Sequence, residues 1–143
     1  MKMITIPNQI KNNFIALLSL AIAISALYYN TWRNEQTEKN RNTRTAAFEV
    51  LKELGDLQVV INYGHYQPNS MMGNSYLGWS HVARISDLSQ LLPSPIPTQV
   101  KMLIDVWGNN WTKIKTNEEA VDKVSKEIDH SRESVLAVLR QLK

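Results

Sequence analysis

The side chains able to perform acid–base or metal chemistry in this 143-residue chain are its histidines and carboxylates, because it contains no cysteine. Its three histidines, His65, His81 and His130, lie far apart, and no two of them have a spacing that would place both on one helix face as metal ligands. We find no glycine-rich phosphate loop, nucleophile elbow or dinucleotide fingerprint. The sequence therefore predicts no catalytic residue, no metal ligand and no cofactor, and the chain is not expected to be an enzyme.

Carboxylates become acid–base catalysts when an apolar pocket shifts their pKa. Glu53 and Asp56 fall on the polar side of the amphipathic helix that contains them, so we expect both to be solvated. Asp87 lies beside apolar positions of its helix, and we expect its carboxylate to form an ion pair with Arg84 on the same helix. The acidic residues thus predict solvated helix faces.

One segment carries more aromatic and methionine side chains than a simple connection needs. Residues 64–78 contain three glycines, one proline and two asparagines, which predicts a long loop. Exposed aromatics and methionines are typical of adaptable binding surfaces, although the same side chains could fold back to cap the domain. The candidate partner- or ligand-binding residues of this region are His65, Tyr66, Met71, Met72, Tyr76 and Trp79.

The formal net charge of +3 is unevenly distributed along the chain. From residue 45 onward there are ten Lys or Arg and eleven Asp or Glu, so this part is close to neutral. It lacks the basic stripe that binding to a phosphate backbone requires. We therefore expect no nucleic-acid partner.

An almost wholly apolar run, residues 14–29 (FIALLSLAIAISALYY), predicts a membrane-spanning helix. At ~1.5 Å per residue it covers about 24 Å, and its flanks extend it toward the ~30 Å hydrocarbon layer. We place the anchor at residues 14–32, with Tyr28, Tyr29 and Trp32 as the interface belt. The alternatives are a signal peptide cleaved near residue 25 and a buried core helix of a soluble protein.

Small side chains on the predicted membrane helix would let a second helix approach closely. They recur at three- and four-residue steps along one face, at Ala16, Ser19, Ala23 and Ala26. We expect this face to pack against a second copy of the chain or another membrane protein. The alternative is that these residues reflect only the usual composition of membrane helices.

The orientation of the anchor is predicted from the basic residues near its ends. Two Lys precede it and four Lys or Arg follow it closely. This favours a single-pass protein of the cell (inner) membrane whose N-terminal tail, residues 1–13, is translocated and whose soluble domain is cytoplasmic.

The rest of the chain has the pattern of helices. Residues 33–45 are polar and contain neither Gly nor Pro, which predicts a helical stalk, with a flexible linker as the alternative. Residues 46–143 form the soluble domain, whose first helix is expected to end before Gly64. Two more helices are predicted at 79–92 and 97–115.

A fourth helix is predicted after a capping box formed by Thr116 and Glu119. Its apolar residues follow a 4-3 spacing from Val121 to Leu142, interrupted only by Ser131, whose hydroxyl should bond to a carbonyl or a neighbour. The predicted fold is all-α, with one transmembrane helix continuing into a soluble antiparallel bundle of about four helices. A three-helix domain on a coiled-coil stalk is the alternative.

These features predict a membrane-anchored helical interaction module that acts as an accessory, regulatory or scaffolding subunit. Its expected partners are the lipid bilayer and either a second copy or another membrane protein. The alternative is a helical bundle that senses a small molecule, through the loop aromatics and the pair Trp107 and Trp111, and signals through a separate partner. Core filling is the competing interpretation of that tryptophan pair.

Overall fold

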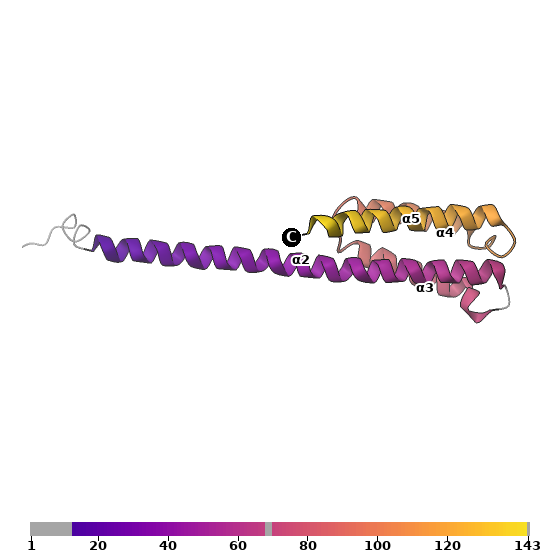
Figure 1. The fold of residues 1–143 in the computed structure, drawn as a ribbon, viewed down its shortest axis with the longest axis horizontal. Helices are drawn as coiled ribbons and strands as arrows, with labels where there is room; N and C mark the ends of the chain where they lie inside the picture. Colours follow the sequence, from indigo (N-terminus) through magenta and orange to yellow (C-terminus); the bar gives the residue numbers. More distant parts are fainter. Residues whose placement is uncertain (1–12, 68–69, 143) are drawn as a thin grey trace, which may run out of the picture. The chain divides into compact units, whose positions relative to one another are not determined.

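The computed structural model describes residues 13–67 and 70–142, which form helices and short connections without any strand. Figure 1 shows how the elements follow one another. Their bounds are α2 (Phe14–Tyr66), the 3-10 helix η1 (Met71–Gly73), α3 (Ser75–Ser89), α4 (Ile96–Asn110) and α5 (Glu118–Gln141). The all-α prediction is confirmed, whereas the predicted tail, residues 1–13, lies outside the described residues except for its last position.

The chain divides into two compact units, Met1–Lys39 and Asn40–Lys143. Helix α2 supplies both the described helical part of the first unit and the first helix of the second. Residues 33–45, predicted as a stalk, belong to α2 and are helical throughout. The domain boundaries placed after residues 32 and 45 stay predictions.

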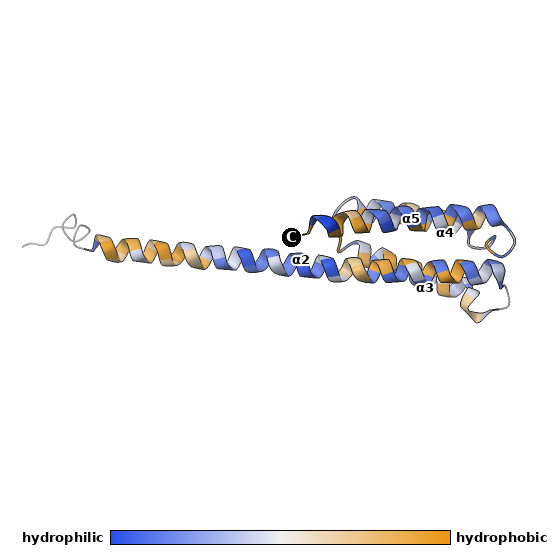
Figure 2. Cartoon of the chain, viewed as in Figure 1, coloured by the Kyte–Doolittle hydropathy of each residue, from blue (hydrophilic) through white to orange (hydrophobic). Residues whose placement is uncertain are grey.

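The first part of α2 is apolar and exposes its side chains. Figure 2 shows this hydrophobic stretch followed along the same helix by a hydrophilic one. By length and composition, α2 is the one helix in the described part of the chain that could cross a membrane, and none of its apolar window is buried. A core helix of a soluble protein would be mostly buried, so the structure does not support that alternative, whereas a signal sequence would have the same composition.

One hydrophobic core holds the second unit together, and all four α-helices contribute to it. The fully buried stripe of α2 consists of Val50, Leu54, Leu57 and Ile61. The 4-3 stripe predicted on α5 is buried from Val121 to Val138. Its polar member, Ser131, is fully buried, and its Oγ has no hydrogen-bond partner in the described part of the chain, so the bond expected for this hydroxyl is not formed.

Helices α2 and α5 of the second unit run antiparallel. Gln58 Nε2 donates to Ser125 Oγ at 3.0 Å, and Arg44 Nη2 donates to the carbonyl of Leu142 at 2.9 Å, so positions earlier on α2 meet positions later on α5. Helix α4 contacts both α3 and α5, and short connections join successive helices. The four helices thereby surround their common core as a bundle (Figure 1).

The loop between α2 and α3 is shorter than predicted. Helix α2 continues through Gly64 to Tyr66, and α3 begins at Ser75 instead of Trp79. A Cβ added to Gly73 would lie 2.5 Å from the backbone nitrogen of Gly64, so the backbones of α2 and η1 touch. Gly64 and Gly73, which contributed to the prediction of a long loop, therefore permit a close contact between the two backbones.

The other helix ends differ from the predictions by a few residues. Helix α3 ends at Ser89 and α4 at Asn110, both earlier than predicted. The predicted capping box at Thr116 is wrong, because the extended backbone at Asn117 makes that residue the N-cap and its Oδ1 accepts the N–H of Ala120 at 3.2 Å. Asparagine is at least as good an N-cap as threonine, and Asn117 is the residue that directly precedes the first residue of α5.

Candidate functional site

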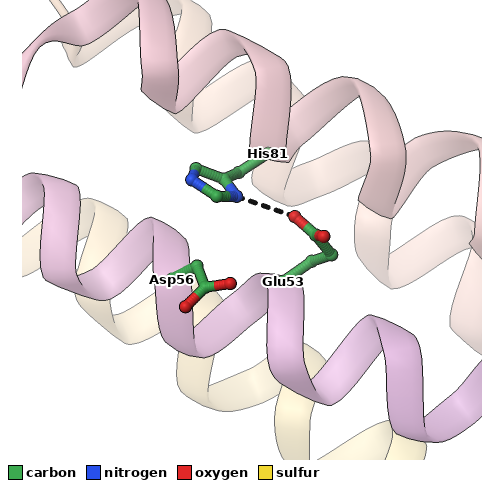
Figure 3. Close-up of side chains that lie close together, drawn as sticks. All are labelled: Glu53, Asp56 and His81. Carbon is green, nitrogen blue, oxygen red and sulfur yellow. Dashed lines mark hydrogen bonds and ion pairs between the residues drawn. The ribbon is translucent and has the colours of Figure 1, made fainter.

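Four polar side chains meet between α2 and α3 at the edge of the core. Glu53 and Asp56 are three residues apart on α2 and project from one side of it, and His81 and Arg84 have the same relation on α3. Figure 3 shows the side chains of Glu53, Asp56 and His81 converging in the space between these helices. We call these four residues the Glu53 cluster.

Both carboxylate oxygens of Glu53 are occupied. His81 Nδ1 lies 2.7 Å from Oε2, and Arg84 Nε donates to Oε1 at 2.9 Å. Arg84 Nη2 also lies 2.9 Å from His81 Nδ1, but a single nitrogen cannot donate to Glu53 and accept from Arg84 at once. A lone pair facing the carboxylate would be repelled, so we assign the Nδ1 proton to the bond with Glu53.

Glu53 is buried, with 7% of its surface exposed, and the prediction that it is solvated is wrong. Burial raises the pKa of its carboxyl group, but the hydrogen bonds from His81 and Arg84 and their electrostatic attraction outweigh this, so the pKa lies below its usual value. Arg84 therefore pairs with Glu53 on another helix, where the sequence predicted a pair with Asp87 on its own helix. An ion pair with a buried carboxylate has a more favourable Coulomb energy than one with an exposed carboxylate, because the effective dielectric constant is lower there.

Asp56 adds a second carboxylate to the cluster. It is half-buried and has no hydrogen-bond or ion-pair partner among the residues the structure describes. One potential ligand atom from each of Glu53, Asp56 and His81 lies within 4.8 Å of the other two. These three residues are the ones that could hold a metal ion.

Sequence patterns alone could not find this cluster. His81 is 28 residues from Glu53, and a helix period does not reveal which residues of two helices will face each other. Glu127 and His130 do form a Glu-x-x-His pair on α5, with Nδ1 and Oε1 3.5 Å apart. Within the described chain no third possible ligand lies beside that pair, whereas Glu53, Asp56 and His81 provide three. A search for ligand spacing along one helix would therefore find the pair on α5 and miss the Glu53 cluster.

Five large apolar side chains at and beside the connection between α2 and α3 are exposed. The surface that we call the end patch consists of Tyr66, Met71, Met72, Tyr76 and Leu77. Met71 exposes 89% of its surface and Tyr76 75%. Four of the six residues predicted for a binding loop thus lie in this patch. Their binding role stays a prediction.

The other two predicted loop residues have partners inside the domain. His65 Nδ1 lies 2.8 Å from the carbonyl oxygen of Ile114 and ties the end of α2 to the α4–α5 connection. The ring of Trp79 packs edge-on against Trp107 at 6.1 Å and Trp111 at 6.2 Å between ring centroids. Both therefore have an evident structural role.

Trp107 fills the core between α3 and α4. It is 1% exposed, and its ring lies so close to Gly78 that any Cβ there would overlap it. Its Nε1 has no hydrogen-bond partner in the described chain. A groove of about 330 Å³ passes the edge of Trp111, and its lining is Asn74, Ser75, Tyr76, Trp111, Thr112 and Lys115.

The residues predicted for helix packing and for the interface belt are exposed on α2. The small residues are Ala16, Ser19, Ala23 and Ala26. The Oγ of Ser19 donates to the carbonyl of Ile15 at 2.8 Å, so this hydroxyl needs no outside partner. In the belt, the rings of Tyr29 and Trp32 lie 6.1 Å apart, and Tyr28 is also exposed. The packing and belt roles stay predictions.

Comparison with protein-family models, with curated proteins and with solved structures finds no match to this chain.

Proposed function

We propose that this chain is a membrane-anchored helical interaction module that works as an accessory, regulatory or scaffolding subunit. One observation carries the proposal: residues 14–29 form an apolar helical segment whose side chains are exposed, whereas the second unit has a core of its own. Such a surface is costly in water and favourable among lipid tails. The hydroxyls of Ser19 and Ser25 bond to carbonyls of their own helix, which is what a lipid-exposed helix requires.

In this proposal the chain crosses the cell (inner) membrane once and its bundle lies in the cytoplasm. The support is the set of basic residues that follow the anchor between positions 33 and 44. Protease should degrade the bundle in opened cells and leave it intact in closed ones. Degradation in closed cells would reverse the orientation, and a mature N-terminus near residue 25 in a soluble fraction would refute the anchor.

The end patch supports the interaction role. Aromatic and methionine side chains adapt to different partner surfaces. The end patch contains exposed residues of both kinds within a short stretch of sequence. We propose that it contacts the soluble part of a second copy or of another membrane protein. The small-residue face of the anchor would support the same association within the bilayer.

A crosslinking experiment in intact membranes tests this role. A photoreactive residue placed at Tyr76 should yield a discrete protein adduct, because that side chain is 75% exposed in the end patch. The matched control is the same residue at Glu133, which is exposed on α5. Adducts that are absent from position 76, or identical at both positions, would refute the patch as an interface.

A small-molecule-sensing bundle is the second candidate, and the groove beside Trp111 favours it. The groove combines an aromatic ring, a lysine and polar side chains, which suits a small organic ligand. Such a ligand should raise the unfolding temperature of the full chain, and Trp111→Leu should abolish that shift. A metabolite screen without any shift would dismiss this candidate.

A further inference from the structure

We propose that the Glu53 cluster binds a divalent transition-metal ion, held by Glu53, Asp56 and His81 in competition with Arg84. Carboxylate oxygen and imidazole nitrogen are donors that zinc and neighbouring metals take in proteins. The three donors come from two helices packed on one core, so the backbone fixes their positions. This inference is independent of the interaction role proposed above.

The geometry needs only local adjustment to accept an ion. Tetrahedral bonds of about 2.0–2.1 Å separate neighbouring donors by roughly 3.3 Å. The 2.7 Å between His81 Nδ1 and Glu53 Oε2 must therefore widen, while donors that lie up to 4.8 Å apart must approach. Rotations of the side chains supply these small movements without moving α2 or α3.

Metal binding requires that the proton between His81 Nδ1 and Glu53 Oε2 leave this position. A metal ion that binds Nδ1 displaces this proton, and the neutral imidazole carries it on Nε2 instead. The ring then coordinates through a lone pair and gains no charge. Solvent would supply the remaining ligand, as in zinc sites with three protein ligands.

The charges of the cluster favour a divalent ion over the present arrangement. The cluster holds two carboxylates: Glu53 pairs with the guanidinium of Arg84, whereas Asp56 has no cationic partner among the described residues. An ion of charge +2 would neutralise both carboxylates. The side chain of Arg84 is 51% exposed, so it can turn into solvent when the ion enters.

Zinc titration of the full chain in detergent micelles, without a histidine tag, tests the proposal. Zn²⁺ affinity is measured by competition with a chromogenic chelator, and the absorption spectrum of bound Co²⁺ reports the ligand set. His81→Gln and Asp56→Asn should each weaken Zn²⁺ binding at least about 10-fold, because each replaces an imidazole or a carboxylate with a weak neutral amide, and even the loss of an outer-shell partner has an effect of this size. His130→Gln, which alters the pair with Glu127, is the matched control and should change nothing.

Arg84→Gln gives the sharpest test, because it is expected to strengthen Zn²⁺ binding, whereas the two ligand variants are expected to weaken it. Removing the competing guanidinium should strengthen Zn²⁺ binding roughly 10-fold. A purely structural Glu53 cluster predicts no such gain. Zn²⁺ binding that is absent, that is unaffected by His81→Gln and Asp56→Asn in folded variants, or that is weakened by Arg84→Gln would overturn the proposal.

Discussion

Replacing Gly78 with alanine tests the packing of α3 against α4. The new Cβ would overlap the ring of Trp107, which is 1% exposed and is bordered by Trp79 at a centroid distance of 6.1 Å. The ring therefore cannot move aside without disturbing its other neighbours. Because the overlap involves ring atoms and not the end of a flexible side chain, we expect the backbone of α3 to shift.

Two opposing effects set the size of this change. Overpacking a core costs about 1–3 kcal/mol, and the rigid surroundings of Trp107 place Gly78→Ala near the upper end. Alanine gains up to about 1 kcal/mol over glycine in a helix. We therefore expect Gly78→Ala to lower the free energy of unfolding by about 2 kcal/mol.

Gly55 provides the matched control within the same bundle. A Cβ at Gly55 would meet nothing within 4 Å, so Gly55→Ala should raise the free energy of unfolding by up to about 1 kcal/mol. Urea unfolding of the full chain in micelles, followed by circular dichroism and tryptophan fluorescence, measures both variants. If Gly78→Ala proved as stable as the parent chain, the described contact between α3 and Trp107 would be refuted.

Three further perturbations address other contacts. In metal-free buffer, stability should fall as pH drops through the lowered folded-state pKa of Glu53, and Glu53→Gln should remove this part of a urea-measured pH profile. Asn117→Ala should cost about 1 kcal/mol, while Thr116→Ala leaves the unfolding midpoint unchanged, and equal effects would contradict the assigned cap. His65→Ala should cost about 1 kcal/mol through the lost bond to Ile114, and an unchanged midpoint would contradict that bond.

Features that depend on neighbours along the chain could be predicted from the sequence. The 4-3 spacing from Val121 to Val138 identified the buried side of α5, because a helix repeats its faces at a fixed interval. The apolar run 14–29 likewise identified an exposed hydrophobic helix segment. The predicted loop position of Gly64 and Gly78 is wrong, because these glycines lie in α2 and α3 and allow close contacts with Gly73 and Trp107, which a local pattern does not reveal.

The sequence by itself determined the helical class, the approximate places of the helices and the apolar N-terminal segment, since each follows from local composition and period. Only the tertiary structure decided that Glu53 is buried and that His81 and Arg84 reach it from α3. A helix period shows which side of a helix is apolar. Which polar side chain at its edge meets a partner depends on how the neighbouring helix is placed, and that is set by packing of the whole core.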